Sequence, residues 1–158
     1  MSETSIKIEG LDKLLKKVDP KLLSKPLRNF FQRSTIAIQN RAREKAPVDT
    51  GRLRAGIATE VDHSSPPKWG KVGTNVKYAP FVEFGTRPHW PPPGVLQPWA
   101  RRHGFPPGAR GDFLVRRAIA QHGTRARPYL TPAFEESMSD IKHFLDRVAD
   151  EIKAGWGS

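Results

Sequence analysis

The chain has 158 residues and contains no cysteine. That absence excludes disulfide scaffolds, cysteine-ligated zinc, iron–sulfur clusters and thiol nucleophiles, and it leaves the redox compartment unspecified. Long apolar runs are also missing, because no stretch approaches the roughly 18 apolar residues that cross a bilayer. Residues 1–10 lack the apolar core of a signal peptide. We therefore expect a protein made in the cytosol, with no membrane partner.

Catalytic signatures are equally scarce. The five histidines show neither the HxH nor the HExxH spacing of a metal site. The glycines of residues 104–111 follow no predicted strand and lack the lysine of a phosphate-binding loop. Glu135 and Glu136 are adjacent on a predicted helix and so point in different directions, unlike an acid–base pair. The sequence thus predicts no catalytic residue, no cofactor and no metal ion.

The chain is poor in large apolar residues and rich in positive charge. Leu, Ile, Val and Phe make up about 23% of it, only slightly above the roughly 20% at which charged chains stay disordered, so we expect a modest core. Lys and Arg number 27 against 16 Asp and Glu, which gives a net charge of +11. Such a balance indicates anionic partners, either nucleic acid or acidic protein surfaces. Composition alone does not separate the two.

A chain of this length fits one domain, and its composition changes along the sequence. We interpret residues 1–158 as a single domain of four segments. These are an N-terminal segment (1–19), a helix plus hairpin (20–87), an insertion rich in Pro, Trp and Arg (88–127) and a C-terminal helix (128–158). Within the first segment, a short amphipathic turn is predicted from Leu11, Leu14, Leu15 and Val18.

The second segment starts with a long amphipathic helix that Pro47 ends. Its apolar residues recur at spacings of three, four or multiples of four, namely Leu23, Leu27, Phe30, Ile38 and Ala42. Pro26 falls inside this pattern, where it removes a backbone hydrogen bond. Either Ser24 caps a helix that begins there, or the helix bends at Pro26.

A change of period after the helix predicts two strands. Residues 53–61 alternate apolar and polar side chains as a half-buried strand does, and residues 69–76 form a second candidate strand. The Ser-Ser-Pro-Pro sequence at residues 64–67 predicts a turn, so the two strands should pair as an antiparallel hairpin. Gly73 indicates a bulge near the end of the second strand.

The insertion at residues 88–127 has seven prolines between Pro88 and Pro107, which prevents a long regular element. Short helices are predicted at residues 95–102 and 112–121, with loop elsewhere. The insertion contains arginine, which forks onto carboxylates or phosphates, and tryptophan, a typical interface anchor. We interpret it as an arm that docks acidic surfaces of partner proteins, with a solvated flexible insertion as the alternative. The docking candidates are Trp90, Trp99, Arg101, Arg102, Arg116 and Arg117.

The last segment predicts a second long helix, with Thr131 as N-cap and Pro132 as the first helical residue. Its apolar stripe steps by three and four residues through Phe134, Met138, Ile141, Leu145, Val148 and Ile152. We expect Ile141 and Leu145 to be buried against the first long helix. The predicted fold class is therefore α+β, with both long helices packed on one face of a small antiparallel sheet and a Pro/Arg-rich loop insertion.

Three short motifs stand out beside these elements. Residues 46–54 join the first helix to the first strand, and ordinary turn chemistry explains them. Residues 78–86 place three aromatic side chains around one acid before a glycine. Residues 127–133 begin the last helix directly after an arginine. Each motif therefore has a structural explanation that competes with a functional one.

Glu83 is the functional candidate of the second motif. An acid isolated among aromatic side chains usually needs a basic partner. Phe81 and Phe84, on either side of it, are expected in the core or in an interface. The candidate partners of Glu83 are Arg52, Arg54 and Arg127, within the subunit or in the next one.

The order of the motifs resembles the gene-product-ten family of long-tailed bacteriophages. The chain has Ala-Pro-Val-Asp-Thr-Gly-x-Leu-Arg after the first helix, then Gly-Thr-Asn-Val-x-Tyr-Ala-Pro-Phe-Val-Glu-Phe-Gly-Thr, and finally Arg-Pro-Tyr-Leu-x-Pro-Ala. The resemblance spans about residues 20–150. Carried over by motif, the interface or structural positions are Pro47, Asp49, Thr50, Gly51, Leu53, Arg54, Tyr78, Glu83, Gly85, Thr86, Arg127, Pro128 and Pro132.

The resemblance implies a function in virion assembly. The family supplies tail-completion or head–tail joining proteins, broadly comparable to the minor tail protein Z of phage lambda. It implies a non-enzymatic virion component that forms a ring of six subunits at the head-proximal end of the tail. The implied partners are further copies of the chain and the neighbouring neck proteins, which are the connector or stopper and the tail terminator or tail tube. Contact with genomic DNA in the channel is left open.

Two other classes stay open. A dedicated DNA-binding protein is favoured by the net charge and the interleaved Trp and Arg, although the charge is scattered and no helix-turn-helix or RNA-binding signature is present. A nuclease or another phage enzyme is the third class.

Overall fold

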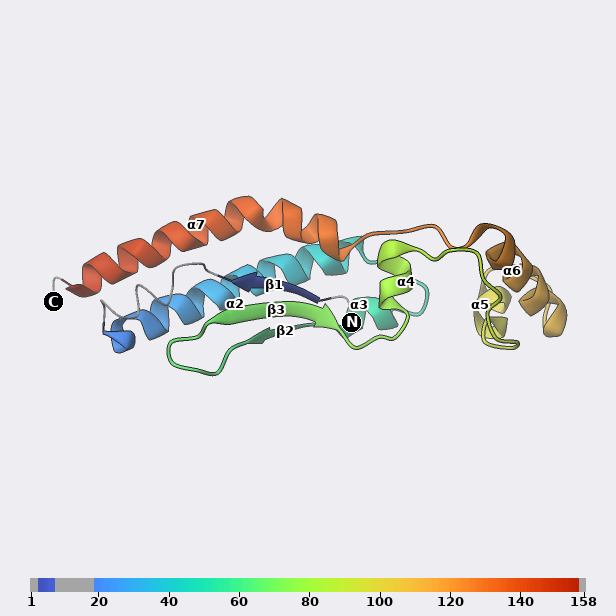
Figure 1. The fold of residues 1–158 in the computed structure, drawn as a ribbon, viewed down its shortest axis with the longest axis horizontal. Coiled ribbons are helices and arrows are strands. Elements are labelled where there is room, and N and C mark those ends of the chain that lie inside the picture. The colour runs from blue at the N-terminus through green and yellow to red at the C-terminus, as the bar shows by residue number, and fades with distance from the viewer. Residues whose placement is uncertain (1–2, 8–18, 157–158) are drawn as a thin grey trace. The chain divides into compact units, whose positions relative to one another are not determined.

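A computed structural model describes residues 3–7 and 19–156, which form two compact units (Figure 1). Unit 1 comprises residues 1–79 and 128–158, and unit 2 comprises residues 80–127. Unit 1 is therefore made of two separate stretches, one N-terminal and one C-terminal, whereas unit 2 is one continuous stretch between them in the sequence.

This division bears on the predicted organisation. The insertion at residues 88–127 lies within unit 2, whereas the single domain stays a prediction. The amphipathic turn predicted within residues 11–18 lies outside the described residues.

Unit 1 is built on helix α2 (Pro20–Lys45). Asp19 is its N-cap, because the Asp19 carboxylate accepts a hydrogen bond from the backbone N–H of Lys21 at 2.9 Å. Pro20 begins the helix. At this position a backbone N–H would have no partner within the helix, so its absence in proline costs nothing. The predicted cap at Ser24 is therefore wrong, since the helix has already begun upstream of it.

Pro26 lies inside α2 and is buried. The helix continues past the N–H that Pro26 lacks. The C-cap is Ala46, whose backbone N–H donates to the carbonyl of Ala42 at 2.9 Å, and Pro47 follows, which confirms the predicted end. Buried side chains lie on a broad part of the helix surface. They include Leu23, Leu27, Phe30, Phe31, Ile38 and Ala42.

The sheet of unit 1 has three antiparallel strands in the order β1-β3-β2. β2 (Ile57–Val61) and β3 (Trp69–Thr74) form the predicted hairpin. β1 (Glu3–Lys7) pairs with the other side of β3 and was not predicted. Gly73 pairs in regular register with both neighbouring strands, so the predicted bulge is wrong.

The first half of the strand predicted at residues 53–61 is instead a helical turn, α3 (Arg52–Gly56). Gly51 precedes the turn with φ of 78°, a conformation that costs glycine little because it has no Cβ. The Gly51 carbonyl accepts a hydrogen bond from the Ala55 N–H at 2.9 Å, and the turn buries Leu53. The apolar alternation therefore belongs to one helical turn followed by a shorter strand.

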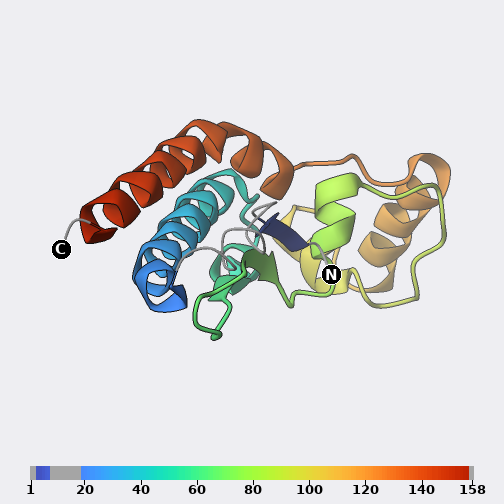
Figure 2. The ribbon, with the colours of Figure 1, turned by 60° about the vertical axis from the view of Figure 1, so that its left-hand side comes forward.

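α2 lies between the sheet and the last helix, α7 (Leu130–Trp156) (Figures 1 and 2). It contacts β2 and β3 on one side and α7 on the other, while α7 contacts the sheet at β1. Gly70 of β3 lets the sheet approach α2 closely, since a Cβ there would lie 2.8 Å from Cγ2 of Thr35. The α+β class is confirmed, and within it α7 packs chiefly on α2.

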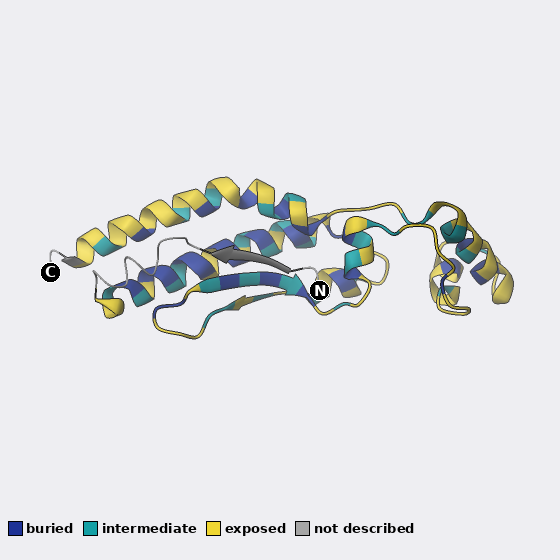
Figure 3. Cartoon of the chain, in the orientation of Figure 1, coloured by how far each residue is buried: buried dark blue, intermediate teal, exposed yellow. Residues whose placement is uncertain are grey.

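The buried side of α7 differs in part from the predicted stripe (Figure 3). Ile141 is buried as expected, but Met138 and Leu145 are 39% and 41% exposed, so the expected burial of Leu145 is wrong. The residues of α7 that are buried lie along a different line on the helix, which includes the small residues Ala133 and Ser137. The buried line consists of Leu130, Ala133, Ser137, Ile141 and Val148.

The start of α7 also differs from the prediction. The helix begins at Leu130, so Thr131 lies within it and is not the N-cap. Pro132 is the third helical residue, still in the first turn, where a missing N–H is tolerated.

Unit 2 contains α4 (Ala79–Phe84, whose first residue belongs to unit 1), α5 (Gln97–Arg102) and α6 (Ala109–His122). The last two confirm the predicted short helices. The chain enters and leaves the unit side by side, because Thr86 and Thr124 form an antiparallel bridge with N···O distances of 3.1 and 3.2 Å.

Candidate docking surface

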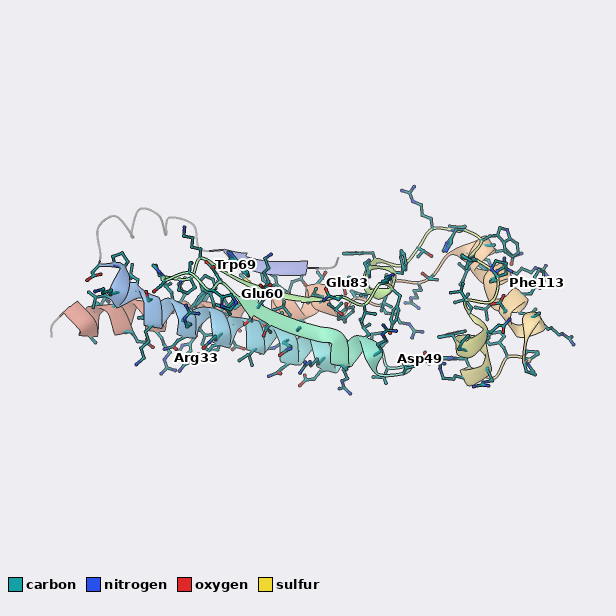
Figure 4. All side chains as sticks on the ribbon, turned by 90° about the horizontal axis from the view of Figure 1, so that it is seen from below. Arg33, Asp49, Glu60, Trp69, Glu83 and Phe113 are labelled. Carbon is teal, nitrogen blue, oxygen red and sulfur yellow. The ribbon has the colours of Figure 1, made fainter. Side chains whose placement is uncertain are left out.

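The first motif, residues 46–54, serves the fold of unit 1. Leu53 is buried, and Nε of Arg54 donates to the carbonyl of Arg43 at 2.8 Å, which satisfies a carbonyl of the last turn of α2. Pro47 is half-buried. An interface role for the remaining positions stays a prediction. The exposed residues of the motif include Val48, Asp49, Thr50 and Arg52, of which Figure 4 labels Asp49.

The second and third motifs meet where the chain enters and leaves unit 2. The backbone N–H of Arg127 donates to the carbonyl of Val82 at 2.8 Å, close to the bridge between Thr86 and Thr124. Gly85 has φ of 71°, and a Cβ on it would collide with the Thr124 carbonyl oxygen. The motif glycine is therefore required for the two backbone segments to pass each other.

The aromatic side chains around Glu83 are on the surface. Phe81 and Phe84 are 58% and 70% exposed, whereas Glu83 between them, which Figure 4 labels, is 3% exposed. This excludes the core for both rings and leaves the interface as their expected place. Tyr78 and Pro128 are also exposed. The arginine partner of Glu83 stays a prediction.

Asp112 organises the interior of unit 2. Its carboxylate is buried and accepts hydrogen bonds from the backbone N–H groups of Gly94 and Leu96, at 2.9 and 3.2 Å. It also lies 3.8 Å from the guanidinium of Arg116, whose Nε donates to the carbonyl of Pro91 at 2.7 Å. One acid on α6 thereby fixes the proline-rich loop against the helix.

An aromatic pair lies on this frame. The ring of Trp90 has its centroid 6.2 Å from that of Phe113, and the guanidinium carbon of Arg116 lies 5.5 Å from the Trp90 ring, within cation–π range. Both rings are about half exposed. Arg116 is half-buried and lies over the Trp90 ring, so it has a positioning contact, while its docking role stays a prediction.

Three further docking candidates, Trp99, Arg101 and Arg102, lie on α5, and Arg117 lies on α6. The Trp99 ring stacks on His103, with centroids 3.9 Å apart and an interplanar angle of 14°. It is 36% exposed, so part of this residue is accessible. Arg101 and Arg102 are exposed in the last turn of α5.

Sequence reasoning missed the exposed face of α6. Arg110, Phe113, Leu114 and Arg117 are all exposed and follow the i, i+3, i+4, i+7 spacing of one helix face. We call these four residues the α6 face, and Figure 4 labels Phe113 within it. The spacing was visible in the sequence, but a helix expected to start at residue 112 left Arg110 outside it.

The exposed charge of unit 2 has one sign. The unit contains eight arginines, no lysine and two acids, Glu83 and Asp112, which are both buried. Seven of the eight arginines are exposed. The formal charge presented to a partner is therefore carried by guanidinium groups, which form paired hydrogen bonds with carboxylates and phosphates.

Unit 1 has an open pocket of about 520 Å³ between α2 and β2, with no set of residues suited to catalysis. Its lining consists of Arg28, Gln32, Thr35, Ile36, Thr59, Val61 and His63. Within residues 3–7 and 19–156, no three His, Cys, Asp or Glu side chains group as metal ligands would. No helix in this described part is long and apolar enough to cross a membrane.

The loop between β2 and β3 is held by one carboxylate. Asp62 accepts hydrogen bonds from the hydroxyl and the backbone N–H of Ser64, and from the backbone N–H of Lys68. These hydrogen bonds, led by that of the Ser64 hydroxyl, lower the pKa of Asp62 from 3.8 to about 2.

Comparison with protein families bears on unit 1 and the start of unit 2. Residues 9–85 match the family described as "Bacteriophage HK97-gp10, putative tail-component". This part of the chain is similar to the HK97-gp10-like family. The match confirms the resemblance to the gene-product-ten family over residues 9–85, and it supports a structural role in a phage tail. Neither a curated protein nor a solved structure matches the chain significantly.

Proposed function

We propose that this protein is a structural, non-enzymatic subunit at the head-proximal end of a phage tail. There it forms a ring of six copies, completes the tail and joins it to the head. The observation that carries the proposal is the family match, because it includes α2 and the β2–β3 hairpin, which form the scaffold of unit 1.

Exposed apolar residues of unit 1 support contact between subunits. Ile36 on α2 is 49% exposed, and Met138 and Leu145 on α7 are exposed to a similar degree. The outer strand β2 adds a sheet edge, and such edges pair readily with another chain. A ring would cover surfaces of this kind.

Unit 2 supplies the contact with other neck proteins in this proposal. Its surface combines arginine with the exposed rings of Phe81, Phe84 and Trp90, a composition typical of protein interfaces. The expected neighbours are the connector or stopper and the tail terminator or tail tube.

The test is a phage with an early stop codon in this gene. Electron microscopy of the lysate should show DNA-filled heads and separate tails, and a plasmid copy of the gene should restore joined particles. Joined, infectious particles without the protein would contradict the proposal. Light scattering of the purified protein measures whether it forms six-subunit rings.

A basic DNA-binding protein is the second candidate, because unit 2 has a net charge of +6 with both acids buried. A gel-shift titration with duplex DNA at increasing salt separates the two functions. Strong binding by a monomer that falls steeply with salt would favour the DNA-binding protein. A ring with little affinity for DNA supports the tail subunit.

A further inference from the structure

We propose that the α6 face is inserted into an apolar groove, rimmed by carboxylates, on a different protein of the virion. This inference rests on the proposed function and deepens it, because it gives the docking arm a contact site and its partner a chemistry.

The first step is the arrangement of side chains on α6. Phe113 and Leu114 are 49% and 40% exposed at the centre of the α6 face, with Arg110 one turn before them and Arg117 one turn after. Anchors at i, i+3, i+4 and i+7 are the pattern by which an amphipathic helix occupies a groove on its partner. Trp90 extends the apolar centre through its contact with Phe113.

The second step is the rigidity of the helix that carries this face. The opposite side of α6 is buried through Gly111, Asp112 and Val115. Asp112 ties the helix to the proline-rich loop by hydrogen bonds to two backbone N–H groups. A face presented by a fixed helix loses little conformational freedom on binding, which favours affinity.

The third step is the charge of the partner. Exposed charge in unit 2 is carried by arginine, and its two acids are buried, so the rim of the groove must be acidic to match Arg110 and Arg117. Aromatic residues and arginine are enriched in protein interfaces, while lysine is depleted. Unit 2 has eight arginines and no lysine.

The apolar centre argues against the backbone of duplex DNA as the partner. The phosphate backbone of a duplex offers hydrogen-bond acceptors and negative charge. It offers no apolar floor for Phe113 and Leu114, whose burial between the two arginines requires one. A protein groove satisfies both the apolar and the charged requirement.

The experiment places a benzophenone amino acid at Phe113 in the full chain and cross-links assembled virions with light. Mass spectrometry should find the label joined to a different virion protein, on a segment with apolar residues and at least one Asp or Glu nearby. A cross-link to DNA, to the same chain or to a second copy, or no cross-link at all, would overturn the proposal. The same label at Val95, an exposed residue of unit 2 outside α6, should not reach that segment.

Substitutions test the same contact without a label. Phe113→Ala with Leu114→Ala should reduce the number of joined particles at least about tenfold, as the loss of an interface anchor does. The matched control is Val95→Ala, which removes another exposed apolar side chain of unit 2 and should leave the count unchanged. Unchanged counts for the double variant would overturn the proposal. A melting curve equal to that of the parent protein shows that α6 still folds.

Failure of this inference is separable from failure of the proposed function. If the protein is absent from purified virions, the proposed function fails. If it is present and required for joining, but Phe113 contacts no other virion protein, only the docking of the α6 face fails.

Discussion

The two units of this chain differ in how they pair their charges and how densely they carry net positive charge. Unit 1 contains 19 Lys and Arg against 14 Asp and Glu, and some of these pair directly, as Arg41 does with Asp140 at 2.6 Å and Lys45 with Glu136 at 2.7 Å. Unit 2 has 48 of the 158 residues but +6 of the net charge of +11, with both of its acids buried. Unit 2 therefore carries just over half of the net charge in under a third of the residues, which makes it the part better suited to an anionic partner.

The units also differ in where they place aromatic side chains. Phe30 and Phe31 of unit 1 are almost fully buried between the sheet and α7, whereas Phe81, Phe84 and Phe113 of unit 2 are about half exposed or more. The comparison teaches that unit 1 buries Phe30 and Phe31 in its core, while unit 2 keeps several phenylalanine rings available for binding.

The largest expected effect is in the core of unit 1. Ile141→Ala should lower the free energy of unfolding by about 2–5 kcal/mol, because Ile141 is buried and its truncation leaves a cavity. Leu145→Ala is the matched control on the same helix and should cost less than about 1 kcal/mol, since Leu145 is 41% exposed. Urea titrations measure both values. Equal losses would mean that α7 is rotated from the position described here.

The next effect concerns the entry of the chain into unit 2. Gly85→Ala should lower stability by about 2–4 kcal/mol, because a positive φ and a collision with the Thr124 carbonyl act together. Gly104→Ala isolates the first cause, since Gly104 has φ of 77° and free space around it, and should cost about 1–2 kcal/mol. Hydrogen exchange should locate the Gly85 effect in residues 80–127. Loss of protection in α2 instead would contradict the view that the two units respond separately.

A smaller effect is expected at Glu83. Glu83→Gln should lower the free energy of unfolding by about 1–3 kcal/mol, because a buried carboxylate loses its charge-assisted interactions. Thermal melts and light scattering measure stability and ring mass together. If neither changes, the predicted pairing of Glu83 with an arginine is wrong.

The smallest effect is a pH dependence in unit 1. The folded pKa of Asp62 is about 2, below its ordinary 3.8, so its carboxylate stabilises the β2–β3 loop fully above about pH 4. That contribution is lost as the pH falls through about 2. Exchange of the Ser64 and Lys68 amide protons should therefore speed up in that window, and Asp62→Asn should abolish the pH dependence of this exchange. A midpoint near 4 in the parent protein would show that the hydrogen bonds do not form.

Most of the scaffold could be predicted from local patterns. The apolar spacing of α2, the turn between β2 and β3, and the short helices of unit 2 each depend on neighbouring residues. β1 could not be predicted in this way, because this five-residue strand is defined by its pairing with β3, which lies far along the chain. α3 was mistaken for strand because Leu53 and Ile57 fit a period of two and a helical spacing of four equally well.

The candidate site was only partly predictable. The arginine and tryptophan content of the insertion was visible, but the role of Asp112 was not, since its partners are backbone N–H groups of a distant loop. The prediction that Leu145 is buried was wrong, because apolar spacing defines a broad stripe and does not say which edge of that stripe faces α2. To predict the α6 face, one would have needed the observed start of the helix, which lies three residues before the predicted start.

The measurement that tests the central difference between the units most directly is a matched removal of surface arginines in the phage. One variant replaces two exposed arginines of unit 2 with serine, and the other replaces two exposed arginines of unit 1. The two sets are Arg110 and Arg117, and Arg33 and Arg147. The account predicts unjoined heads and tails for the unit 2 variant and normal particles for the unit 1 variant, with both proteins stably folded. Equal numbers of joined particles from the two variants would contradict it.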